Sequence, residues 1–307
     1  MLRQLVGVLP VLLAASIALA AESPSSQPAV DAQRARVLRG TLGTYAGEPR
    51  SADKRVDPHR LITELKDLKA NTYNWLIWHQ PTDWEDLQKF LPLAREAGIR
   101  VWVTLVPPSE SPPRTRAYSE PFRLDYQKWA VEIARLSLRE PNLVAWSIDD
   151  FLHNTDVFSP KKLRPIITAA REINPKLAFV PCCYYAQVKR GLAKGYGDLL
   201  DGVLFPYRNE SVKADLKDPG QVEKEVNDLR KMLGANLPII VDVYATAHSR
   251  LGASTPEYVN EVIRAARASA DGVMIYCHQD PKTNREKYEA IKTQFRAEAA
   301  GRGIDPR

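Results

Sequence analysis

The sequence has little cysteine and none of the cysteine spacings that mark common metal or redox sites. Its 307 residues include only Cys182, Cys183 and Cys277, and no CxxC pair occurs. A zinc ribbon and a thioredoxin-type redox site are therefore excluded. Adjacent cysteines seldom bond to each other, so we expect buried free thiols on strands. A single disulfide bridge is the alternative in an oxidising compartment.

Patterns that bind phosphate or nucleic acid are missing as well. Gly40 and Gly43 lie inside the first apolar run, and no GxGxxG follows it, although a doubly wound dinucleotide-binding sheet would carry that motif. The formal net charge is +6, but the basic residues are scattered and no Lys/Arg tract is interleaved with aromatics. We therefore expect no nucleic-acid partner.

Long apolar runs are absent except near the first residue. There Arg3 precedes the run LVGVLPVLLAASIAL, which leads into the small-x-small sequence ALA. This pattern predicts a secretory signal peptide over residues 1–20, cleaved near Ala20. The run is short for a transmembrane helix, so we expect no membrane span and a secreted or periplasmic protein. Residues 21–34 are rich in Ser, Pro and Ala, which predicts a flexible linker.

Beyond the expected linker, short apolar runs alternate with amphipathic segments eight times. The runs are rich in β-branched and aromatic residues, as is typical of parallel strands covered on both faces. Eight strand–helix units in about 260 residues predict a single (β/α)8 TIM barrel of the α/β class over residues 35–299. Residues 300–307 are expected to form a C-terminal tail. The expected strands are 37–45, 72–79, 99–106, 143–151, 177–185, 202–207, 238–246 and 272–278, and the expected helices are 57–70, 82–97, 125–139, 159–173, 188–192, 220–233, 256–269 and 283–299.

The carboxyl ends of the expected strands are rich in aromatic, carboxylate and amide side chains, and hold four of the five histidines. Active sites of barrels lie at these strand ends, and sugars bind to aromatic faces combined with fixed polar groups. We therefore expect a carbohydrate substrate, although any one of these aromatics would also serve to fill the barrel interior. The expected substrate-binding residues are Tyr45, Trp75, Trp78, His79, His153, Tyr184, Tyr207, Arg208, Tyr244, His248, Tyr276 and His278.

Two kinds of residue in this set have a second interpretation. At least two of the histidines are expected to do no more than satisfy loop backbone groups. Arg208 and Asn209 are suited to an acidic sugar, but Arg208 could equally pair with Asp201 or Glu210. The loops at 109–113 and 208–218 are expected to shape the binding cleft.

Asp149 and Asp150 are adjacent carboxylates at the end of the fourth apolar run, LVAWSIDDF. Burying such charges costs several kcal/mol unless they are paired or used, so both are candidate catalytic residues. Neighbours in a strand point to opposite sides. Ser147 lies on the same side of the strand as Asp149, which favours an Asp149 that points into the barrel. If the strand ends before Asp150, that residue can also reach the barrel mouth. In the alternative, one aspartate caps the following loop and the other forms an ion pair.

Asp242 is a charged residue inside the seventh apolar run, PIIVDVYAT. It shares parity with Tyr244, Thr246 and His248, so this polar face is expected to point into the barrel. Strands four and seven lie across the mouth from each other, and glycoside hydrolysis usually needs two carboxyl groups flanking the scissile bond. Asp242 is therefore the expected catalytic partner. Its deeper position leaves a role in orienting Tyr244 or a histidine as the alternative.

The segments LVAWSIDDF and PIIVDVY, within eight strand–helix units, resemble those of the (β/α)8 glycoside hydrolases. That superfamily includes the cellulase-like enzymes and exported glycosidase-like barrels. Its members place an acid/base carboxylate at the end of strand four and a nucleophile at the end of strand seven. The resemblance therefore implies these roles for Asp149 or Asp150 and for Asp242. The cellulase-like pattern has Asn-Glu and Glu at these places, whereas this chain has Asp-Asp and Asp.

The resemblance implies a glycoside hydrolase that acts on a poly- or oligosaccharide by two-carboxylate chemistry, with no cofactor and no metal. A non-catalytic carbohydrate-binding barrel is one alternative, since a fold alone does not imply activity. A metal-dependent hydrolase similar to polysaccharide deacetylases is another, because Asp149, Asp150 and His153 are residue types that suit Zn²⁺. Against it, the sequence contains no HxH or HxxxH pair.

Overall fold

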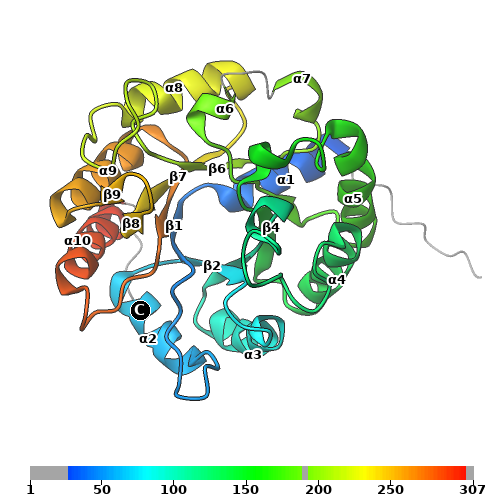
Figure 1. The fold of residues 1–307 in the computed structure, drawn as a ribbon, viewed down its shortest axis with the longest axis horizontal. Coiled ribbons are helices and arrows are strands. Elements are labelled where there is room, and N and C mark those ends of the chain that lie inside the picture. Colours follow the sequence, from blue (N-terminus) through cyan, green and yellow to red (C-terminus); the bar gives the residue numbers. More distant parts are fainter. Residues whose placement is uncertain (1–26, 189–192, 302–307) are drawn as a thin grey trace, which may run out of the picture.

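The computed structural model describes residues 27–188 and 193–301, and within them eight parallel strands form one curved sheet. The strand order is β5-β4-β3-β2-β1-β10-β7-β6. The two ends of this order meet just after β5, where Cys182 and Leu204 form a parallel bridge and the Cys183 N–H donates to the Leu204 carbonyl at 2.9 Å. Helices surround the sheet (Figure 1). The predicted (β/α)8 barrel is confirmed.

The elements follow the predicted alternation closely. The barrel strands are β1 (Thr41–Tyr45), β2 (Thr72–Ile77), β3 (Arg100–Leu105), β4 (Leu143–Ile148), β5 (Ala178–Phe179), β6 (Val203–Pro206), β7 (Ile239–Tyr244) and β10 (Gly272–Tyr276), and β8 (Ala247–His248) and β9 (Gly252–Ala253) form a small hairpin. The described helices are α1 (Gln27–Leu38), α2 (Pro58–Leu68), α3 (Asp83–Glu96), α4 (Tyr126–Arg139), α5 (Pro160–Ile173), α6 (Tyr185–Val188), α7 (Ala193–Tyr196), α8 (Val222–Leu233), α9 (Pro256–Ser269), α10 (Arg285–Gly301) and the short 3-10 helices η1 (Pro108–Glu110) and η2 (Phe151–Asn154). No helix in these described ranges is both long enough and apolar enough to cross a membrane.

The strands divide their side chains between two hydrophobic layers because successive residues point to opposite faces. On β3, Trp102 joins the cluster inside the barrel, whereas Val101 and Val103 join the larger cluster under the helices. On β2, Leu76 faces inward and Trp75 faces the helices. This alternation fixes which residues of each strand can reach the mouth.

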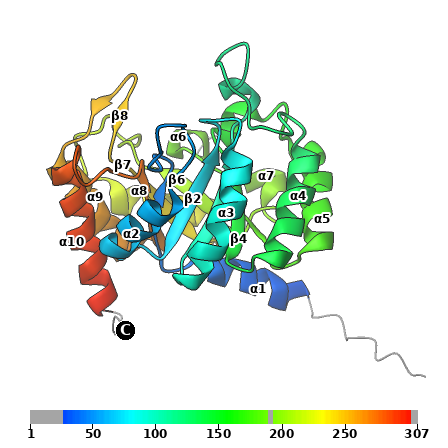
Figure 2. The same cartoon turned by 90° about the horizontal axis from the view of Figure 1, so that it is seen from below.

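Helix α1 occupies residues for which the composition predicts a linker and the start of a strand. Leu38, at its end, is fully buried in the cluster inside the barrel. Arg34 is also buried, and it donates to Asp201 Oδ1 and to the Pro175 carbonyl, each at 2.7 Å. Figure 2 shows α1 beneath the barrel, at the end away from β8. The linker prediction is thus wrong for residues 27–34, because long-range contacts rather than local composition stabilise this helix.

The fifth strand is much shorter than the predicted segment 177–185. Pro181 has no N–H to donate to a strand ladder, which interrupts regular pairing after Phe179. The chain then enters α6, and most of the predicted helix 188–192 lies outside the described residues. The last helix, α10, continues to Gly301, two residues past its predicted end. The predicted signal peptide over 1–20 and the rest of the predicted tail also lie outside the described residues.

Candidate active site

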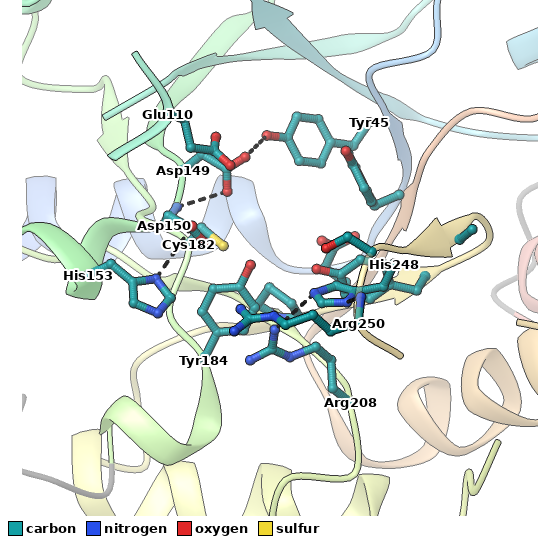
Figure 3. Close-up of a pocket in the computed structure, with 16 residues that line it drawn as sticks. Tyr45, Glu110, Asp149, Asp150, His153, Cys182, Tyr184, Arg208, His248 and Arg250 are labelled. Atoms are coloured by element: carbon teal, nitrogen blue, oxygen red, sulfur yellow. Dashed lines mark hydrogen bonds and ion pairs between the residues drawn. The ribbon is translucent and has the colours of Figure 1, made fainter. Parts of the chain in front are cut away.

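A cavity of about 280 Å³ opens at the carboxyl ends of the strands (Figure 3). Both of the adjacent aspartates and the β7 aspartate line it, together with much of the expected aromatic and basic set. The predicted site residues that line it are Tyr45, Asp149, Asp150, His153, Tyr184, Arg208, Asp242, Tyr244, His248 and Tyr276. The cavity also takes in residues that sequence reasoning missed, above all Glu110, Cys182 and Arg250.

Asp149 follows β4 directly, and both of its carboxyl oxygens are held in place. The Tyr45 hydroxyl donates to Oδ2 at 2.9 Å, and the backbone N–H of Asp150 donates to Oδ1 at 2.9 Å. Burial and the negative charge of Asp150 raise the pKa of Asp149 to about 6, against the opposing hydrogen bonds from Tyr45 and Cys182. A fixed carboxyl group with a pKa near neutrality is suited to general acid or base catalysis.

Asp150 reaches the same cavity because the strand ends at Ile148 and the backbone then turns sharply. Its φ of 40° and ψ of 36° lie in the left-handed region, so the alternation of a strand no longer applies to it. His153 Nδ1 lies 3.5 Å from Asp150 Oδ2. Burial acts to raise the pKa of Asp150, but hydrogen bonds from His153 and Tyr184, with the charges of His153 and Arg208, outweigh burial and leave the pKa below its ordinary value.

Asp242 projects from β7 and is 3% exposed. Its Oδ1 makes no hydrogen bond within the described part of the chain. Burial and the charge of Asp149 raise the pKa of Asp242 well above its usual value. A buried acceptor without a partner costs about 1–3 kcal/mol, so a hydroxyl group entering the cavity gains a hydrogen bond at this oxygen.

Glu110 adds a fourth carboxyl group that the sequence did not single out. It ends η1, in the loop after β3, and Figure 3 shows it beside Asp149. Burial and the charges of Asp149 and Asp150 raise the pKa of Glu110 to about 8. Its only sequence signal was its place in the 109–113 loop, because it does not lie at the end of a strand.

A row of tyrosines forms another part of the lining. The ring centroids of Tyr45 and Tyr276 are 5.2 Å apart, and those of Tyr276 and Tyr244 are 5.5 Å apart. Their rings supply the aromatic surface expected of a sugar-binding site. Tyr45 and Tyr276 end neighbouring strands β1 and β10 in register, which explains why residues far apart in the sequence pack together here.

Arg208 and Arg250 lie on the opposite side of the cavity from Glu110 and Tyr45 (Figure 3). The guanidinium carbon of Arg208 is 3.9 Å from the centroid of the Tyr184 ring, and the same side chain pairs with Glu210. Glu210 is thus one of the two partners predicted for Arg208. The other, Asp201, instead pairs with Arg34 and with Arg171.

Two predicted sugar-binding residues are buried in the protein core instead. Trp75 faces the helices, and its indole N–H donates to the Asp83 carbonyl at 3.1 Å. Tyr207 is fully buried, and its hydroxyl donates to the Asp218 carbonyl at 2.7 Å. Neither lines the cavity, because each side chain is committed to the layer between the strands and the helices.

Trp78, His79 and His278 also lie outside the cavity lining. His278 is buried with both ring nitrogens engaged, Nδ1 at 3.0 Å from Thr44 Oγ1 and Nε2 at 2.9 Å from Glu64 Oε2. The indole of Trp78 donates to a loop carbonyl, and His79 bonds to a buried glutamate. The partners of these two histidines are side chains, whereas the prediction was that such histidines satisfy loop backbone groups.

The three cysteines are free, as predicted, and Cys182 and Cys183 are buried. Cys182 lines the cavity, where burial and the charges of Asp149 and Asp150 raise its pKa well above the ordinary value. It is therefore a neutral thiol rather than a thiolate nucleophile. In the described ranges, no three His, Cys, Asp or Glu side chains are grouped so as to hold a metal ion.

No family model and no curated protein matches the sequence. Solved structures do match the fold. A GH2 β-galacturonidase from Eisenbergiella tayi bound to galacturonate is 14% identical with a TM-score of 0.55, over 84% of this chain and 51% of that one. The β-D-glucuronidase of Dictyoglomus thermophilum is 15% identical with a TM-score of 0.53, over 84% and 50%. Pseudomonas stutzeri endoglucanase Cel5A is 9% identical with a TM-score of 0.56, over 82% and 93%.

The chain therefore spans about half the length of the β-galacturonidase and the β-glucuronidase, and most of the length of the endoglucanase. At identities this low, the similarity shows a shared barrel fold. A shared fold does not by itself assign a reaction to this chain.

Proposed function

We propose that this protein is a glycoside hydrolase that cleaves a poly- or oligosaccharide by two-carboxylate chemistry. One observation carries the proposal: Asp149 and Asp242 reach one cavity from β4 and β7, and Asp150, whose pKa is lowered, stands beside Asp149 in the same cavity. Glycoside hydrolysis needs one protonated carboxyl group for the leaving oxygen and one carboxylate to attack the sugar or activate water. The glycoside hydrolases that share the fold support the same class of reaction.

Asp149 is assigned as the proton donor. Tyr45 and the Asp150 backbone fix its orientation, and a pKa of about 6 lets it give and recover a proton near neutral pH. The fixed negative charge of Asp150 helps to hold that proton, which is a reason for two adjacent aspartates at this strand end.

Asp242 is assigned as the opposing carboxylate. It comes from β7, whereas Asp149 follows β4, so a sugar bound between them meets carboxyl groups from two sides. Substrate hydroxyls that donate to its unpartnered Oδ1 would favour the ionised form and lower its pKa. Without such a donor, burial and any negative charge on Asp149 favour the neutral form of Asp242.

The proposal is tested by release of reducing sugar from a panel of polysaccharides, with the wild type beside Asp149→Asn and Asp242→Asn. We expect each substitution to lower kcat by about 100-fold or more, with folding intact by circular dichroism. On aryl glycosides with an activated leaving group, Asp149→Asn should recover activity and Asp242→Asn should not, because only the leaving-group proton becomes dispensable.

Other results would overturn the proposal in recognisable ways. Binding of a glycan without turnover of any substrate would indicate a non-catalytic binding barrel. Release of acetate that a chelator abolishes would indicate a metal-dependent deacetylase. Recovery of activity by Asp242→Asn rather than Asp149→Asn would exchange the two assigned roles.

A further inference from the structure

The basic side of the cavity has no part in the two-carboxylate chemistry. Arg208, Arg250 and His248 gather there, away from Glu110 and Asp149 (Figure 3). A site that only had to cleave a neutral sugar would not need two guanidinium groups at its wall. Their presence bears on which sugar the cavity accepts.

Arg208 is held rigidly and still has donor capacity. It stacks on Tyr184, pairs with Glu210, and places Nη1 3.4 Å from His248 Nε2. Its Nε is buried and makes no hydrogen bond to any residue that the structure describes. Nη1 and Nη2 each carry a second hydrogen beyond their contacts with His248 and Glu210, and these are the donors left for a carboxylate.

Arg250 lies in the turn between β8 and β9 and is exposed. Its side chain makes no ion pair with any residue of 27–188 and 193–301, while Arg208 pairs with Glu210 and its charge also acts on Asp150. Burial and the positive charges of Arg208 and Arg250 lower the pKa of His248, and the opposing charge of Asp150 offsets this only in part. This side of the cavity therefore carries positive charge that the protein leaves partly uncompensated.

We propose that the sugar bound in this cavity is anionic, and that Arg250 and Arg208 bind its acidic substituent. The inference rests on the proposed function in taking the ligand to be a sugar. The substituent is a carboxylate, as in a hexuronic acid, or a sulfate ester, because a guanidinium fork recognises both. With that group held at the basic side, the rest of the sugar extends toward Asp149 and Asp242.

A cationic amino sugar is the opposite case. Its ammonium group would be drawn to Asp150 and repelled by Arg250, which would reverse its orientation in the cavity. A neutral sugar would leave Arg250 without any partner. Anionic, neutral and cationic sugars differ in charge but little in size. Their relative affinities therefore show which charge the cavity prefers.

The experiment measures binding by titration calorimetry to the Asp149→Asn variant, so that no turnover interferes. The probes are glucuronic acid, galacturonic acid, glucose 6-sulfate, glucose, galactose and glucosamine. We expect at least one anionic sugar to bind about tenfold or more tightly than its neutral counterpart, as loss of a charged hydrogen bond costs that much. Tightest binding of a uronic acid would identify the acidic substituent as a carboxylate, and tightest binding of glucose 6-sulfate would identify it as a sulfate.

The same titrations with Arg250→Gln added should abolish the preference for the anionic sugar. Arg250 is exposed on a hairpin, so the substitution should leave folding intact. Arg135→Gln, an exposed arginine on α4 that is 58% exposed, is the matched control and should keep the preference. Equal affinity for charged and neutral sugars, tightest binding of glucosamine, or a preference that survives Arg250→Gln would overturn the inference.

The outcomes for the two proposals are separable. Selective binding of an anionic sugar by a protein that cleaves no glycoside supports this inference and overturns the hydrolase proposal. Cleavage of neutral glycans without any preference for anionic ones supports the hydrolase proposal and overturns this inference.

Discussion

The hydroxyl of Tyr45 donates a hydrogen bond to Asp149 Oδ2 at 2.9 Å, joining residues that are 104 positions apart in the chain. Tyr45 ends β1, and Asp149 follows the end of β4. The bond stabilises the ionised form of Asp149, whereas the charge of the neighbouring Asp150 destabilises it. These two opposing influences act on the pKa of the assigned proton donor beside the larger effect of burial, and they can be removed one at a time.

Replacing Tyr45 with Phe removes the hydrogen bond and should raise the pKa of Asp149 above about 6. The alkaline limb of the profile of kcat/KM against pH should then move to higher pH, because Asp149 keeps its proton longer. Loss of one orienting contact should also lower kcat by about tenfold. An alkaline limb that moves to lower pH would contradict the assignment of Asp149 as the donor.

Replacing Asp150 with Asn should act in the opposite direction. It removes the negative charge that raises the pKa of Asp149, so the alkaline limb should move to lower pH and activity at pH 7 should fall. The matched control is Asp156→Asn, an exposed aspartate shortly after η2, which should leave the profile unchanged. If both variants behave alike, the charge of Asp150 does not control Asp149.

Glu110→Gln should stabilise the protein at alkaline pH. The pKa of Glu110 is raised to about 8, so the folded state resists losing this proton, and stability that is present near pH 4 is lost as the pH rises through 8. Glutamine avoids that loss. We expect Tm to exceed that of the wild type by about 2 °C or more at pH 9, and the gain to shrink toward pH 4.5. A gain that does not depend on pH would point to packing instead.

Arg34→Ala should destabilise the barrel without touching its mouth. The Arg34 and Asp201 side chains are 2% and 5% exposed, and removing one partner of a buried ion pair costs about 3–5 kcal/mol. Because Asp201 also contacts Arg171, we expect the low end of that range, measured by urea unfolding. Arg36→Ala, exposed on the same helix, should have little effect, and below the unfolding transition Arg34→Ala should bind sugars normally.

Much of the fold could be predicted from the sequence because strand and helix periodicities are local properties. The eight apolar runs each became a barrel strand, within four residues of their predicted bounds except for β5, which ends six residues early. Parity along β7 predicted the pocket face for Asp242 and Tyr244, which line the cavity, whereas Thr246 does not line it and His248 reaches it from β8, beyond the end of β7. The alternation of side chains between the two faces of a strand, applied to β2, would have placed Trp75 on the helix side of the sheet.

The remaining features depend on contacts between distant parts of the chain. Composition predicted a linker where α1 lies, since nothing local shows that Leu38 fits the base of the barrel and that Arg34 meets Asp201. Glu110 entered the cavity through a loop, whose course no periodicity describes.

What the sequence alone determined was the barrel and the identity of the strand-end aspartates, because both follow from patterns within a few residues. Only the tertiary structure decided that Asp149 and Asp150 face the same cavity, and that Tyr45 donates to one of them. It also placed Arg250 away from Glu110 and Asp149. The physical reason is that pKa values and ligand charge preference depend on burial and on distances between groups, and folding sets these only when the strands close into a ring.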